Sequence, residues 1–188
     1  MRSALCSIFC VVLTFLAVNL KAQAPDGWGI RGGFHRAGQF LEGEKQYGNL
    51  NTFHVGVFHN RRFGESILSL YAETAYHQVG FKDGSDNMQN FRKIHQLAGV
   101  LALRADFGPI FLILGPALYA KLGEKFELAG VDILDSDTEY RSLDIPVVAS
   151  VGVQLGAFSI DARYSYSFTK DQNDYRSAFL QLGAGFAF

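Results

Sequence analysis

Six charged residues have the types and spacing to do chemistry, because each falls on the polar face of a segment whose other face is apolar. Carboxylates and cationic groups that meet away from water form ion pairs and hydrogen-bonded networks. Such a network either lines a polar path for ions or locks a closed interior. We expect a four-membered network and, nearer the other end of the fold, a separate Lys121–Asp144 pair. The network members are Glu73, Arg104, Asp161 and Arg163.

The five histidines raise the alternative of a lipid-modifying enzyme. No His-x-Ser pairing occurs in the sequence. His77 and Glu73 are four residues apart on one strand face, which is too far for the direct contact that a catalytic triad needs. The glycines show no phosphate-loop spacing. We therefore predict no catalytic residue, no cofactor and no enzymatic activity.

An acidic segment, residues 123–139, has six carboxylates against Lys125 alone. Asp135, Asp137 and Glu139 lie close enough in sequence to share a hard cation such as calcium if the segment bends, but the glycine and the full ligand set of an EF-hand are missing. The preferred interpretation is a solvated loop without a metal. A docking surface for a basic partner is the other alternative, with an apolar centre at Val131, Ile133 and Leu134.

The elements that must position the charged residues are β-strands, and the stretch from Tyr140 to Phe168 shows their pattern most clearly. Two segments of strict alternation flank Gly156 and Ala157, which predicts a hairpin with a two-residue turn. One face is apolar or aromatic throughout, and the other is small or polar. The turn fixes the register, which pairs Gln154 with Ser159, Gly152 with Asp161, Ser150 with Arg163, Val153 with Ile160, Val151 with Ala162, Ala149 with Tyr164 and Val147 with Tyr166.

Residues 1–22 read as a secretory signal peptide, with Arg2, an apolar run from Leu5 to Val18 and small residues near the cleavage site. The run is well short of the roughly 20 residues of a spanning helix. Both cysteines lie in this segment, so no disulfide is expected in residues 23–188. Without Arg2 and Lys21, 15 basic residues stand against 18 acidic ones, a net charge of −3 that suggests no nucleic-acid partner.

Eight segments alternate with a period of two, and their connections are alternately long and short. An even number of antiparallel strands with short turns at one end and long loops at the other is typical of an outer-membrane barrel. A lipocalin-like soluble barrel, with the apolar face turned inward, is the competing fold. Strand length, glycine on the polar faces and aromatic residues near the strand ends favour lipid outside. The segments are residues 28–34, 52–63, 67–80, 91–106, 110–122, 143–155, 158–168 and 177–188.

The sequence therefore predicts an all-β protein, an eight-stranded antiparallel transmembrane β-barrel in an up-and-down meander, over residues 23–188. Residues 35–51 and 123–139 are expected to be long polar loops.

Four stretches, LYAETAYHQVGF, FGPIFLILGPALYAKL, SLDIPVVASVGVQLGAFSIDARYSYSF and the terminal LQLGAGFAF, resemble the PorT-like outer-membrane β-barrel family. The likeness extends over nearly the whole of residues 23–188. It implies an integral outer-membrane protein of a Gram-negative bacterium, and some members of that family are linked to protein secretion and gliding. It also implies that Phe188 is the aromatic end that such barrels present to their assembly machinery.

The expected function is that of a structural or interaction scaffold in the bacterial outer membrane. Its partners are then membrane lipid, the barrel assembly machinery, and an extracellular or secretion-related protein that contacts the outer loops. The alternatives are a narrow, porin-like pore and, less favoured, a lipid-modifying enzyme. Because an eight-stranded barrel has room for side chains and little more, a salt-bridged plug is favoured over an open path.

Overall fold

The computed structural model describes residues 26–41, 44–45, 48–83, 90–128, 131–133, 143–168 and 176–188. The predicted signal peptide, residues 1–22, lies outside this part. None of the described residues belongs to a helix that is long and apolar enough to cross a membrane. The described residues form eleven strands of one sheet: β1 (Gly27–Leu41), β2 (Glu44–Lys45), β3 (Gly48–Arg62), β4 (Leu68–Asp83), β5 (Asn90–Phe107), β6 (Ile110–Leu128), β7 (Val131–Ile133), β8 (Leu143–Asp144), β9 (Pro146–Leu155), β10 (Phe158–Ser167) and β11 (Arg176–Ala187).

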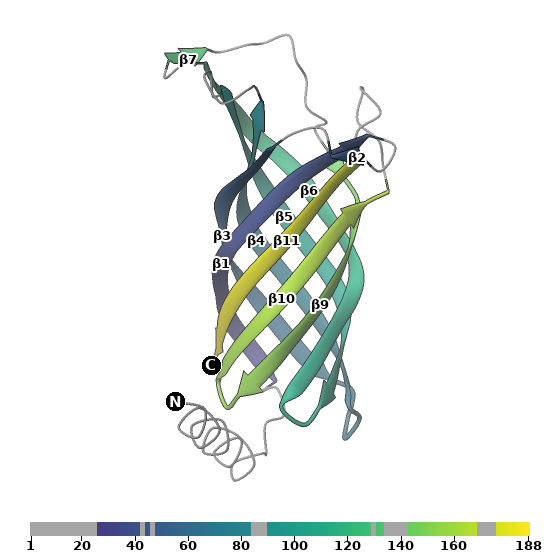
Figure 1. Cartoon of the computed structure of the whole chain (residues 1–188). Coiled ribbons are helices and arrows are strands. Elements are labelled where there is room, and N and C mark those ends of the chain that lie inside the picture. The colour runs from purple at the N-terminus through teal and green to yellow at the C-terminus, as the bar shows by residue number, and fades with distance from the viewer. Residues whose placement is uncertain are drawn as a thin grey trace, which may run out of the picture.

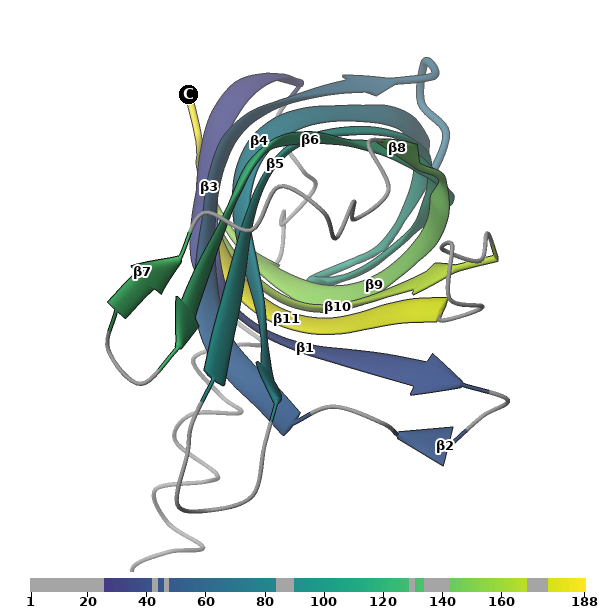
Figure 2. The same ribbon diagram turned by 90° about the horizontal axis from the view of Figure 1, so that it is seen from above.

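Eight long strands close into an antiparallel barrel. The hydrogen-bonded order is β11-β10-β9-β6-β5-β4-β3-β1, and β1 pairs with β11 to complete the ring (Figures 1 and 2). The closing seam runs from Gly29↔Ala187 to Phe40↔Arg176. The three short strands add to this ring, β2 on β1 and both β7 and β8 on β6. The predicted eight-stranded transmembrane meander is confirmed.

Three short connections lie at the barrel end where β1 begins and β11 finishes (Figure 1). They contain Gly64, Gly108 and Gly156, whose φ angles of 59°, 66° and 62° suit a residue without a side chain. The predicted hairpin at Gly156 and Ala157 has the predicted register at every pair, including Gly152↔Asp161 and Ser150↔Arg163.

The outer face of the barrel wall is apolar and exposed, whereas the inner face is polar and buried. Leu114, Ile160 and Leu182 on the outer face are 61%, 64% and 63% exposed, whereas Arg163 and Gln181 on the inner face are 1% and 0% exposed. A soluble barrel would hide the leucines and expose the charges. Because the apolar residues point outward and the polar ones inward, the lipocalin-like alternative is wrong and the outer face suits lipid.

Two predicted loops are shorter in the structure than the sequence indicated, because the strands beside them are longer. β1 continues to Leu41 and β3 starts at Gly48, within the predicted loop 35–51. β6 continues to Leu128, and β7 pairs with it, within the predicted loop 123–139. These extensions lie at the end away from the short turns. These extensions are held by backbone hydrogen bonds, which do not require one apolar face. The sequence therefore lacks the alternation from which a membrane strand is predicted.

The predicted strand 143–155 is interrupted at Ile145, and the structure has β8 and β9 in its place. The residue after the break is Pro146, which has no backbone N–H to donate to a neighbouring strand.

We expect the folded chain to be resistant to SDS until it is heated, because a closed barrel has no free edge at which the detergent can start to open the ladder. Unboiled samples should migrate differently from boiled ones on a gel and keep their β-sheet circular dichroism. Recovery of the chain as a water-soluble periplasmic protein would contradict this fold assignment.

Candidate functional site: the barrel lumen

The middle of the lumen holds four charged side chains from three strands, which we call the central ion cluster: Arg31 of β1, Glu73 of β4, and Asp161 and Arg163 of β10. Each is 4% exposed or less. Their positions follow from the alternation, because each lies on the polar face of its strand. Two positive and two negative charges meet, so the cluster is neutral as a whole, as charges away from water must be.

Arg31 and Asp161 form a two-bonded pair that passes over the inner face of β11, the strand between β1 and β10. Arg31 Nε donates to Asp161 Oδ1 at 2.9 Å, and Nη2 donates to Oδ2 at 2.8 Å. Ser150 Oγ donates to the same Oδ2 at 2.8 Å. Arg31 Nη1 donates to His54 Nε2 at 2.8 Å. This fork geometry holds the guanidinium plane fixed.

Glu73 and Arg163 form the second pair. Arg163 Nη2 lies 2.9 Å from Glu73 Oε2, and Nη1 donates to Oε1 at 3.1 Å. The hydroxyl of Tyr71 also donates to Oε2. Arg31 Nη1 is 3.6 Å from Glu73 Oε1, which links the two pairs into one cluster.

Room for this cluster comes from a residue without a side chain. A Cβ atom built at Gly183 would lie 2.6 Å from Arg31 Nη2, so a larger residue there would displace the guanidinium. Arg31 is absent from the network that the sequence predicted. Its partner Asp161 is two strands away across the β1–β11 seam, so the contact exists only after the barrel closes.

Arg104 does not join this cluster, which corrects the expectation of one network of four. Its Nε and Nη2 atoms donate to Asp106 Oδ1 at 2.9 and 2.8 Å, and Nη2 donates to Gln154 Oε1 at 3.0 Å. The guanidinium carbon also lies 3.9 Å from the centre of the Phe111 ring. Asp106 is two residues away on the same face of β5, so its carboxylate is close enough to pair with Arg104 without a partner from another strand.

Asp144 is buried and accepts a hydrogen bond from Ser167 Oγ. Its register partner is Tyr119 on β6, and Lys121 lies two residues further along that strand. The Lys121–Asp144 pair stays a prediction. Asp135, Asp137 and Glu139 lie outside the described residues, so the calcium alternative for the acidic segment also stays open.

Beside the central ion cluster, three histidines gather in the lumen. The ring centres of His35, His54 and His77 are 5.5 to 5.7 Å apart, and each side chain is 3% exposed or less. His35 Nε2 donates to the carbonyl of Gln78. Because Arg31 donates to His54 Nε2, the proton of that ring is on Nδ1. No group of three His, Cys, Asp or Glu in the described part of the chain has the geometry of a metal site.

Aromatic rings fill the space between these polar groups. Phe58 stacks on Tyr71 with ring centres 5.6 Å apart, His77 meets Tyr119 edge-on at 5.2 Å, and Phe179 packs against Tyr119 at 6.2 Å. Tyr119 also shares a hydrogen bond of 3.1 Å with Ser165. The lumen is therefore a stack of paired charges and packed rings.

Comparison with known proteins agrees with this architecture. A family model described as "Outer membrane protein beta-barrel domain" matches residues 22–171. No curated protein sequence matches the chain. Among solved structures, Ail of Yersinia pestis, in complex with the heparin analogue sucrose octasulfate, is 20% identical, with a TM-score of 0.52 over 87% of this chain and 100% of that one. Neisserial surface protein A is 16% identical, with a TM-score of 0.55 over 87% of this chain and 98% of that one.

Proposed function

Since this chain belongs to the outer membrane protein beta-barrel domain family, we propose that it serves in the bacterial outer membrane as a scaffold that binds other molecules through its outer end, and not as a pore or an enzyme. The observation that carries this proposal is the central ion cluster in the lumen. Arg31, Glu73, Asp161 and Arg163 join three strands through contacts of 2.8 to 3.6 Å and leave their charges paired to each other. Charges that line an ion path face water instead.

The proposed absence of catalysis rests on the partners of the lumen side chains. Glu73 is bound by Arg163 and Tyr71, and Asp161 by Arg31 and Ser150. A general base needs access to a substrate proton. These carboxylates are occupied and buried, and Ser165 contacts Tyr119 and not a histidine.

We propose a basic protein as the partner at the outer end. The long connections leave the barrel there, and the acidic 123–139 stretch runs from the outer end of β6 into the segment before β8. Ail, a structural neighbour, was solved with a heparin analogue, which is a polyanion. A stretch of sequence with six carboxylates and one lysine has the wrong sign for such a ligand. The PorT-like resemblance adds a secretion-related protein as the proposed class of partner.

Contact with the barrel assembly machinery is proposed for Phe188. This residue lies beside β1, where its N–H donates to the carbonyl of Trp28 at 2.9 Å, and its side chain is 73% exposed. An exposed aromatic at the closing seam is available to another protein before β1 and β11 join.

Co-purification from native membranes tests the scaffold. In the test variant, every carboxylate of residues 123–139 becomes its amide: Glu124, Glu127, Asp132, Asp135, Asp137 and Glu139. The matched control carries Asp171→Asn and Asp174→Asn in another connection. Both variants must first show the heat-dependent gel shift. We expect the test variant alone to lose the proteins that co-purify with the wild type, and an unchanged set would refute the acidic docking surface.

A further inference from the structure

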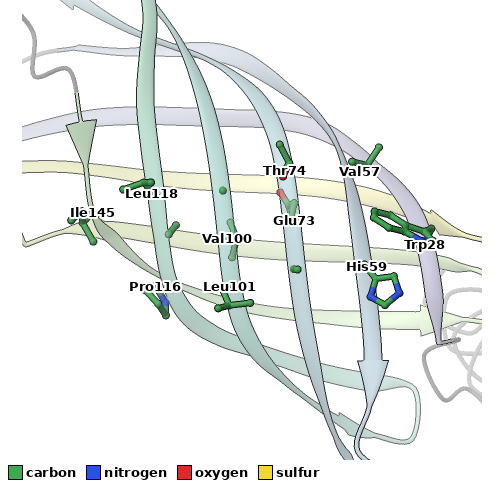
Figure 3. A pocket seen from close by; sticks show the side chains of 13 residues that line it. Trp28, Val57, His59, Glu73, Thr74, Val100, Leu101, Pro116, Leu118 and Ile145 are labelled. Carbon is green, nitrogen blue, oxygen red and sulfur yellow. The ribbon is translucent and has the colours of Figure 1, made fainter.

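The outer face of the barrel carries an apolar groove of about 520 Å³, which has the size of a ligand site in the usual range of roughly 300–1,000 Å³ (Figure 3). One row of the register explains it. Val57, Thr74, Gly99 and Leu118 are successive partners across β3, β4, β5 and β6, so two small residues stand between two larger ones. The wall is therefore hollow at Thr74 and Gly99.

Gly99 differs from the strand glycines that the fold requires. A Cβ atom built at Gly56 or Gly115 would lie 2.5 Å from atoms of the neighbouring strand. At Gly99 the nearest atom is the carbonyl oxygen of Leu118 at 4.0 Å. No packing among the described residues demands a glycine there, so the space above it is open to something else.

The ladder beside the groove is also interrupted. Pairing between β5 and β6 passes through Val100↔Ala117 and resumes at Leu103↔Leu114. Pro116 lies in that interval and has no N–H to donate to a neighbouring strand. Figure 3 shows Pro116 and Leu101 beside one another at this part of the groove.

The groove runs obliquely across the membrane. Trp28 and His59 mark one end, near the start of β1 and the end of β3, where the short turns lie. Ile145 marks the other end, ten residues before the last residue of β9. Short turns of such barrels face the periplasm, so the groove rises from the periplasmic boundary into the apolar interior of the membrane.

The periplasmic end carries an aromatic pair and Arg61, and the backbone N–H of Arg62 donates to Asp26 Oδ1 at 2.7 Å beside them. The rings of Trp28 and His59 meet edge-on with centres 4.9 Å apart, and Arg61 is the next outward-facing residue of β3 and is exposed. Aromatic residues of this kind lie at the level of lipid headgroups, and arginine at that level attracts phosphate.

From these features we propose that the groove binds one glycerophospholipid of the periplasmic leaflet. One acyl chain lies over Thr74 and Gly99, and the phosphate lies beside His59 and Arg61. A lipid from the outer leaflet would bring its headgroup to the wrong end of the groove.

Native mass spectrometry of the barrel from detergent-washed membranes tests the proposal. The wild type should keep one phospholipid. Gly99→Leu fills the groove and should lower occupancy by about tenfold, as expected when roughly 1.4 kcal/mol of affinity is lost. The matched control is Ala149→Leu, a small residue on the outer face of β9 outside the groove. Arg61→Gln should weaken retention of anionic phosphatidylglycerol more than that of zwitterionic phosphatidylethanolamine.

Each variant must show the heat-dependent gel shift, so that a misfolded barrel is not counted as a lost lipid. The proposal is overturned if the wild type keeps no lipid, if Gly99→Leu keeps as much as Ala149→Leu, or if the retained molecule is lipopolysaccharide. A two-copy species that Gly99→Leu abolishes would likewise replace the lipid with a second barrel.

Discussion

Replacing Gly33 by alanine is expected to prevent most of the protein molecules from closing into a barrel. Gly33 of β1 is the register partner of Gly183 of β11 at the closing seam. A Cβ atom at Gly33 would lie 2.0 Å from the carbonyl oxygen of Leu182 and 2.7 Å from Gly183 Cα. Both are backbone atoms of the partner strand, so the clash is relieved only by separating β1 from β11. The usual benefit of alanine over glycine in a strand is about 1 kcal/mol and cannot offset this.

Gly32→Ala is the matched control, one residue away on the same strand. Its Cβ atom would meet nothing nearer than the carbonyl oxygen of His54 at 3.4 Å. The measurement is the fraction of refolded protein that migrates as the heat-sensitive band on an unboiled gel. We expect a normal fraction for Gly32→Ala and a small one for Gly33→Ala. Equal fractions would mean that the seam is more open than the structure has it.

Removing the charge of Arg163 should be the most costly change in the central ion cluster. Arg163→Ala takes away both bonds from the guanidinium to Glu73 and leaves that carboxylate buried, with Tyr71 and the more distant Arg31. Breaking one side of a buried pair typically costs several kcal/mol, so we expect a loss of roughly 3 kcal/mol in the free energy of unfolding. The midpoint of urea unfolding in lipid vesicles measures it.

Two further variants separate charge from packing. Tyr164→Phe changes the next residue of β10, which faces lipid, and should leave the midpoint unchanged. Adding Glu73→Gln to Arg163→Ala removes the unpaired charge and should restore part of the stability, since the two residues act as a unit. A midpoint for Arg163→Ala that equals the wild type would rule out the locked cluster.

The fold was predictable because each strand of a membrane barrel alternates between residues that face lipid and residues that face the lumen. The hairpin around Gly156 shows this best: alternation gave the faces, and the two-residue turn gave the register of Ser150 with Arg163. The predicted strands were too short at the end where the real strands extend beyond the apolar layer of the membrane. There β1 reaches Leu41 and β6 reaches Leu128 without an apolar face to mark them.

The lumen was predictable only in part, for a geometric reason. Alternation tells which residues point inward, so Glu73, Asp161 and Arg163 were named, and the structure brings them together. Contacts between strands inside the lumen also depend on the stagger between strands, and the stagger cannot be read from the sequence of any one strand. That is why Arg31 was left out of the network and Arg104 was wrongly included in it.

Conductance across a planar bilayer tests the central claim, the closed lumen, most directly. After insertion of the refolded wild-type barrel, we predict no stable current steps above the baseline, because Arg31, Glu73, Asp161 and Arg163 span the lumen as a paired cluster. Insertion is checked independently by protease protection of the strands. Reproducible open-channel steps from the inserted wild-type protein would contradict the account and favour the narrow pore.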